Sequence, residues 1–148
     1  MTTSIPTRGD ADLDREIGDR CRVYQEAYGF HTSRYLGPEV IGVIAGQVSA
    51  VIVPRQLGVQ MREMLAWSVP IFSVDRDIWV FLTAGPTDHA DSLEMFRYGA
   101  LVPSRGALIA LPTPGISRRC WMQPPVGRCM PTFTLVADTV IVAAGSRT

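Results

Sequence analysis

Hydrophobic residues near the start of the chain recur at helical spacing. Between positions 13 and 28 they fall three or four residues apart, acidic residues lie early in the segment, and Gly29 follows its end. This pattern predicts an amphipathic helix over residues 13–28 that stops at the glycine. Residues 1–12 are polar and contain no apolar run of the kind found in signal peptides. We therefore expect a short disordered tail over 1–12, followed by a single domain over 13–145.

Runs of β-branched and aromatic residues predict strands further along the chain. These runs are residues 40–44, 48–53, 70–74, 78–83, 101–102, 107–111 and 119–122. The first two are separated by Ala45-Gly46-Gln47, a short link that predicts a hairpin. Asp75-Arg76-Asp77 separates the third and fourth runs and predicts a second hairpin. Ser104-Arg105-Gly106 predicts a turn between the fifth and sixth.

Three further segments have helical patterns. The first starts at Pro54 and ends near Trp67, and its apolar residues share one face: Leu57, Met61, Met64 and Leu65. Residues 88–98 predict a short helix with acids near its start. Residues 131–144 predict the last helix, although 140–142 would also suit a strand. This order of helices and hairpins predicts an α+β fold with a largely antiparallel sheet and three to four helices.

Length and composition are those of one folded domain. The 148 residues are 47% hydrophobic and 19% charged, and no apolar run is long enough to span a bilayer. We expect a cytoplasmic protein with no membrane partner. Cys21, Cys120 and Cys129 are an odd number without close pairing, which indicates reduced thiols. With His31 and His89 they form no local zinc motif, so we expect no metal and no cofactor.

Charge is unevenly distributed, although the net charge is zero. All fourteen basic residues are arginines; residues 1–91 hold eight of them against twelve acids, and residues 92–148 hold six against two. A basic half favours a nucleic-acid backbone or an acidic protein as partner, whereas the simplest interpretation is two solvated faces of one domain. The six arginines form no compact run, which favours the simpler interpretation.

Four arginines of the basic half lie in loop-like segments near a tryptophan in the sequence. The tryptophan is Trp121, and the arginines are Arg105, Arg118, Arg119 and Arg128. Guanidinium and indole groups together bind phosphates and stack on bases, so this set is a candidate nucleic-acid surface. Arginine is equally enriched at protein interfaces, and base rates favour a tryptophan packed in the core. The partner therefore stays open between protein and nucleic acid.

The segment 69–131 resembles part of a known catalytic domain. It contains the run Ser73-Val-Asp-Arg-Asp-Ile-Trp79, then Ala110-Leu-Pro112-Thr113-Pro114, and then Cys120-Trp121-Met-Gln-Pro-Pro125. These motifs are similar to the C-terminal half of bifunctional primase-polymerase domains, which belong to the archaeo-eukaryotic primase superfamily. The resemblance covers under half of the chain and implies a nucleotide-handling scaffold.

The residues that this family uses for catalysis are missing. Nucleotidyl transfer there needs paired acids holding a divalent cation, and residues 40–53 contain no Asp-x-Asp. Trp79 stands where the family has a nucleotide-contacting histidine, and Arg76 and Asp77 stand where it has paired glycines. Asp75 and Asp77 could share one cation, although acids beside a hairpin turn usually serve the turn. The resemblance therefore implies a degenerate site, without metal, at Asp75, Asp77, Trp79, Pro112 and Thr113.

Three functions fit these observations. The one we favour is a non-catalytic binding protein with a degenerate primase-polymerase-like fold, acting on nucleic acid or on a nucleic-acid-processing partner. The second is a nucleotidyltransferase-type enzyme with unrecognised metal ligands. The third is a protein-interaction or assembly module, including a homodimer through the predicted hairpin 40–53, because an apolar strand pair needs a helix or a partner to cover it.

Overall fold

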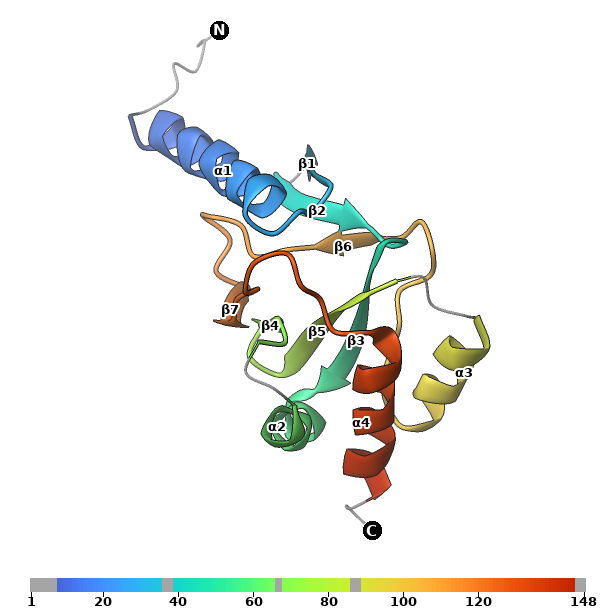
Figure 1. Ribbon diagram of the computed structural model, residues 1–148. Helices are drawn as coiled ribbons and strands as arrows, with labels where there is room; N and C mark the ends of the chain where they lie inside the picture. Colours follow the sequence, from blue (N-terminus) through green and yellow to red (C-terminus); the bar gives the residue numbers. More distant parts are fainter. Residues whose placement is uncertain (1–7, 36–38, 66–67, 86–88, 146–148) are drawn as a thin grey trace, which may run out of the picture.

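The computed structural model describes residues 8–35, 39–65, 68–85 and 89–145, which form four helices and seven strands (Figure 1). In chain order these are α1 (Arg8–Glu26), β1 (Thr32–Tyr35), β2 (Val40–Ile44), β3 (Val48–Pro54), α2 (Arg55–Met64), β4 (Ile71–Val74), β5 (Ile78–Ala84), α3 (His89–Arg97), β6 (Leu108–Ala110), β7 (Arg119–Gln123) and α4 (Phe133–Gly145). Within the described ranges, no helix combines the length and apolar character needed to cross a bilayer.

The strands form two antiparallel sheets. The smaller sheet has the order β1-β2-β6, and the larger has the order β3-β5-β4-β7. With four helices, this arrangement confirms the predicted α+β fold and its antiparallel pairing. Among the described residues β7 pairs with β4 alone, and it therefore ends the larger sheet.

Both faces of the larger sheet are buried. Along β5, Phe81 faces one core and its neighbours Val80 and Leu82 face the other, as the two-residue period of a strand requires. The first core packs against α2, α3 and α4, and the second packs against α1 and the smaller sheet (Figure 1). The continuous apolar run of β5 is therefore explained by cover on both sides.

The predicted hairpin over residues 40–53 is wrong. β2 and β3 belong to different sheets, and the link Ala45-Gly46-Gln47 turns a corner between them. β2 lies in the centre of its sheet, with β1 on one edge and β6 on the other, so no edge remains for β3. β3 pairs with β5 instead. An exposed 40–53 hairpin is thus not present as a dimer surface.

Several predicted boundaries also differ from the structure. Residues 8–12, assigned to a disordered tail, form the first turns of α1, whereas 1–7 lie outside the described residues. β1 was not predicted. On the predicted apolar face of α2, Leu57 and Met61 are buried and Leu65 packs against the first core, whereas Met64 is 49% exposed. Residues 140–142 are helical: Val140 lies in the buried stripe of α4, whereas Val142 is 57% exposed.

The second predicted hairpin is confirmed. β4 and β5 pair in register around a turn in which Asp75 and Arg76 have φ angles of 53° and 68°. These left-handed conformations turn the chain tightly between two twisted strands. The backbone carbonyl of Asp77 accepts a hydrogen bond from the Arg55 N–H at 2.8 Å, and thereby caps the start of α2.

Two helical glycines allow a test of the packing between α2 and the larger sheet. A Cβ atom at Gly58 would lie 2.6 Å from Cε3 of the buried Trp79 ring, whereas one at Gly18 in α1 meets only Arg34 at 3.6 Å. We expect Gly58→Ala to destabilise the protein by about 1–3 kcal/mol, because the overpacking outweighs the gain in helix propensity. Gly18→Ala is the matched control, with an expected gain of up to about 1 kcal/mol. Urea unfolding measures both; equal effects would contradict close packing of α2 on Trp79.

Candidate functional site

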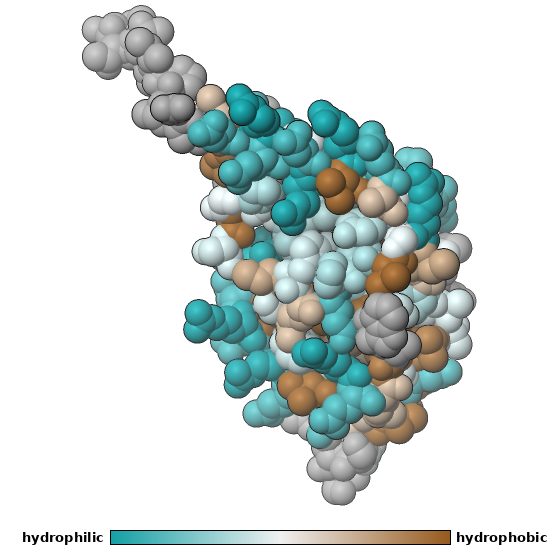
Figure 2. All heavy atoms as spheres, turned by 60° about the vertical axis from the view of Figure 1, so that its left-hand side comes forward, coloured by the Kyte–Doolittle hydropathy of each residue, from teal (hydrophilic) through white to brown (hydrophobic). Residues whose placement is uncertain are grey.

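An open groove runs between α1 and β7 and has a volume of about 560 Å³. Its residues come from the exposed stripe of α1, from the loop after β6 and from β7: Glu16, Asp19, Arg20, Val23, Pro112, Thr113, Pro114, Arg119, Cys120 and Trp121. Figure 2 brings this side of the molecule forward and shows hydrophilic side chains over the exposed face of α1. The groove is the candidate functional site because it gathers four of the residues singled out in the sequence: Pro112, Thr113, Arg119 and Trp121.

The hydroxyl of Tyr24 joins the three segments that form the groove. It donates a hydrogen bond to the Pro112 carbonyl at 2.5 Å and accepts one from the indole Nε1 of Trp121 at 2.9 Å. The Trp121 ring packs edge-on against the rings of Tyr24 and Phe72, with centroids 6.0 and 5.5 Å apart. Tyr24 is 1% exposed. Trp121 is therefore both a packed residue and part of the groove wall.

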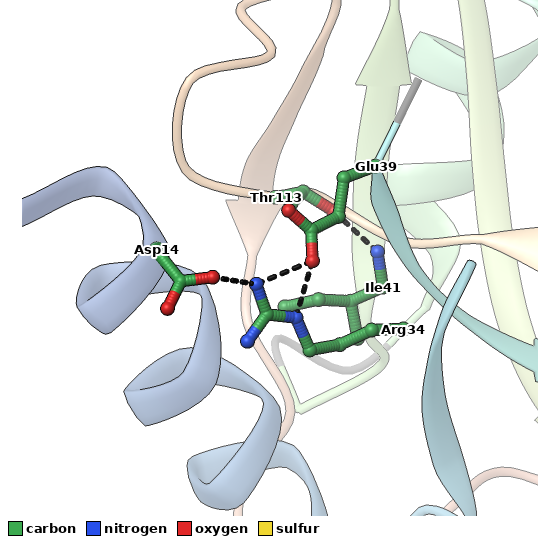
Figure 3. A network of polar contacts seen from close by, with 5 residues as sticks. All are labelled: Asp14, Arg34, Glu39, Ile41 and Thr113. Carbon is green, nitrogen blue, oxygen red and sulfur yellow. Dashed lines mark hydrogen bonds and ion pairs between the residues drawn. The ribbon is translucent and has the colours of Figure 1, made fainter. Parts of the chain in front are cut away.

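Thr113 holds the loop after β6 against the smaller sheet. Its hydroxyl accepts a hydrogen bond from the Ile41 N–H at 3.0 Å and donates one to the Leu111 carbonyl at 2.9 Å. Nearby, the Arg34 side chain of β1 bridges Asp14 of α1 and Glu39, as Figure 3 shows. These contacts set the position of α1 relative to the loop, so Pro112 and Thr113 serve structural roles at the groove.

Arg118 and Asp75 form a two-pronged ion pair beside the groove. Arg118 Nε lies 3.0 Å from Oδ1 of Asp75, and its Nη2 lies 2.8 Å from Oδ2. The guanidinium lowers the pKa of the Asp75 carboxyl. The Asp75 N–H also donates to the Arg118 carbonyl at 2.7 Å. Each residue thus neutralises the charge of the other. The sequence singled out Arg118 for phosphate binding and Asp75 for cation binding, and the ion pair already uses the charge on which each of these roles depends.

Arg119 is different, because no acid among the described residues forms an ion pair with it. Its side chain is partly buried at the groove. Burial lowers the pKa of the Arg119 guanidinium, and the adjacent charge of Arg118 lowers it further. A half-buried guanidinium without an ion-pair partner attracts an anionic group, so Arg119 is the strongest anchor for a ligand in the groove.

The two remaining arginines do not join this surface. Arg105 lies in the turn before β6, whereas the groove lies at the loop after β6. Arg128 donates from Nη2 to the Glu26 carbonyl at 2.9 Å and so caps the C-terminus of α1. The structure therefore brings Arg118, Arg119 and Trp121 together and leaves Arg105 and Arg128 elsewhere.

The remaining family-site positions are also used structurally. Trp79 is 5% exposed and packs in the core against Gly58 of α2. The carbonyl of Asp77 caps α2, as described above. In the part of the chain that the structure describes, no three His, Cys, Asp or Glu side chains gather as a metal site would require. The groove residues of α1 were not singled out in the sequence, because charged residues on a helix normally face solvent.

Comparison with protein-family models, with curated proteins and with solved structures finds no match to this chain. The similarity to primase-polymerase domains thus stays a prediction, and we infer the function from the geometry of the groove.

The Tyr24 hydrogen bonds predict a stability effect. Tyr24→Phe leaves the Trp121 indole N–H and the Pro112 carbonyl without their partner, which should cost about 1–3 kcal/mol in unfolding free energy. Tyr28→Phe is the matched control, because the ring of Tyr28 stacks on Tyr24 and no hydrogen bond of its hydroxyl is recorded among the described residues. Urea unfolding at neutral pH measures both variants. Similar small effects would show that the Tyr24 bridge adds nothing.

The same hydroxyl predicts an alkaline pH dependence. Burial raises the pKa of Tyr24 above its usual 10.0, and hydrogen bonds from Trp121 and Arg20 only partly oppose the shift. Above pH 10 the unfolded chain ionises first, so this stabilising contribution is complete below pH 10 and is lost as the pH rises through the native pKa. We expect the difference in unfolding free energy between the wild type and Tyr24→Phe to shrink over this range. A difference that stays constant to high pH would contradict burial of the hydroxyl.

Proposed function

We propose that this protein is a non-catalytic binding protein that holds an extended segment of a protein partner in the groove between α1 and β7. The observation that carries the proposal is the groove itself, an open hollow beside the edge strand of a sheet whose two faces are both buried. Because helices and the smaller sheet cover those faces, a partner reaches the larger sheet along its edges. Binding grooves beside edge strands commonly take extended peptides.

A non-catalytic role is supported by what the family-site positions do. Asp75 pairs with Arg118, Trp79 fills the core, and the Pro112 carbonyl and Thr113 hydroxyl are bonded within the fold. Each of these side chains or backbone groups already has a structural partner. A catalytic role would require breaking those contacts, which argues for a scaffold used in binding.

The charges of the groove favour a protein over a nucleic acid. Glu16 and Asp19 line the α1 side together with Arg20, and Arg119 lies on the β7 side. Two carboxylates in the same hollow repel a phosphate backbone, whereas a peptide can carry both charge signs. The Val23 side chain and the Trp121 ring also offer apolar surface for side chains. An extended peptide therefore matches the groove better than an oligonucleotide.

The proposed function predicts that filling the groove abolishes peptide binding. Val23 is 43% exposed at the groove, and Val142 is 57% exposed on α4. We expect peptides selected from a displayed library of random twelve-residue sequences to bind the wild type and Val142→Trp equally. Val23→Trp should weaken them by about tenfold or more, because the indole occupies the hollow. Fluorescence anisotropy with labelled peptides measures the affinities, and circular dichroism confirms that both variants fold.

The same titration with single-stranded and double-stranded DNA tests nucleic-acid binding, the competing function. We expect no binding of either oligonucleotide that depends on Arg118 and Arg119. Binding that weakens steeply with salt, and more so for wild type than for the Arg118→Ala, Arg119→Ala double variant, would overturn the peptide proposal. Failure of the library to yield any peptide sensitive to Val23→Trp would overturn it as well.

A further inference from the structure

The outer edge of β7 has a defined set of free backbone groups. The Asp75 N–H bonds to the Arg118 carbonyl, and Val74 lies opposite Arg119 in the register of β4 and β7. In an antiparallel pair, alternate residues direct their N–H and C=O groups toward the partner strand. The backbone N–H and C=O of Cys120 therefore point toward β4, whereas those of Arg119 and Trp121 point away from the sheet.

These outward groups have no partner within the described part of the chain. No hydrogen bond to the backbone N–H or C=O of Arg119 or Trp121 is recorded there, and β7 pairs with β4 alone. The opposite edge of the larger sheet differs, because Ile52 of β3 exchanges two backbone hydrogen bonds of 2.8 Å with Leu101. An unpaired strand edge is a template for another strand. The β7 edge is thus ready to accept one.

The side chains beside this edge indicate which residues the added strand would contain. Arg119 and Trp121 are two positions apart on β7 and both line the groove. Side chains directly opposite one another on neighbouring strands interact, so two residues of an added strand would contact these two side chains. Arg119 has no ion-pair partner among the described residues, and the Trp121 ring offers an aromatic surface.

We propose that the partner segment adds to β7 as a further strand, with an acidic residue opposite Arg119 and an apolar residue two positions away opposite Trp121. This inference rests on the proposed function and specifies how the groove is used. The backbone hydrogen bonds supply affinity, and the spacing of the acid and the apolar residue supplies specificity.

A second copy of this chain is a less suitable occupant. β7 has the sequence Arg119-Cys-Trp-Met-Gln123 and contains no acid, so a symmetric pairing of two β7 strands would bring no β7 carboxylate to Arg119. The same pairing would bring the arginines of both copies to one interface. Charge complementarity therefore selects a different segment that has an acidic residue opposite Arg119.

Capped eight-residue peptides with a central Glu-x-Leu or Leu-x-Glu test the proposal for both strand directions. We expect one order to bind, and Glu→Lys in that peptide to weaken binding by about tenfold or more. Arg119→Glu in the protein should reverse this preference and restore binding of the lysine peptide. Arg15→Glu, an exposed change on α1 outside the groove, is the matched control and should leave the preference unchanged.

Backbone N-methylation tests strand addition separately from side-chain recognition. Methyl groups on the amides that face β7 should abolish binding, whereas methyl groups on the alternate amides, which face solvent, should leave it intact. Equal effects of the two methylation patterns, or no restoration by the charge exchange, would overturn strand addition. Peptides that remain sensitive to Val23→Trp would then show that the groove binds in another way, and the proposed function would stand.

Analytical ultracentrifugation of the full chain supplies the remaining outcome. We expect a monomer whose mass does not change with Arg119→Glu. A dimer that this substitution dissociates would show that a second copy occupies the β7 edge and would overturn the assignment to a different partner segment with an acidic residue opposite Arg119.

Discussion

The bridge through the Tyr24 hydroxyl is the constraint on which the candidate site depends. One oxygen atom of α1 bonds to the Pro112 carbonyl and receives the indole N–H of Trp121. Because Tyr24 is buried, loss of either bond would leave a polar group unsatisfied away from water. The bridge therefore holds a helix, a loop and an edge strand at fixed separations, and the groove is the space that remains between them.

The cover on both faces of the larger sheet directs binding to one of its edges. Its central strand β5 alternates between two cores, one beneath α2, α3 and α4 and the other beneath α1 and the smaller sheet. In the part of the chain that the structure describes, both faces of β5 are covered. One edge is partly closed by the bridge from Ile52 to Leu101, and the other is β7. The fold thus leaves β7 as a place where an outside chain can continue the sheet, and the groove lies beside that strand.

The sequence predicted what short-range patterns encode. The helices and the hairpin of β4 and β5 follow from local periodicity and turn chemistry. The pairing of β2 does not follow from local patterns. Two β-branched runs joined by a short link have the same sequence pattern whether they form a hairpin or belong to two different sheets. The outcome depends on β1, a four-residue polar strand with no distinctive pattern. Similarly, Trp121 and Arg119 were recognised by residue type, whereas the pairing of Arg118 with Asp75 spans 43 positions and needs the fold.

An open β7 edge beside the Tyr24 bridge is the central claim, and residue-resolved amide hydrogen exchange tests it most directly. In the free protein, the Arg119 and Trp121 amides should exchange quickly, because they face away from β4, while the Cys120 amide between them should be protected by its bond to β4. This alternation is the expected result. Equal protection of all three amides would show that the edge is already closed and would contradict the claim.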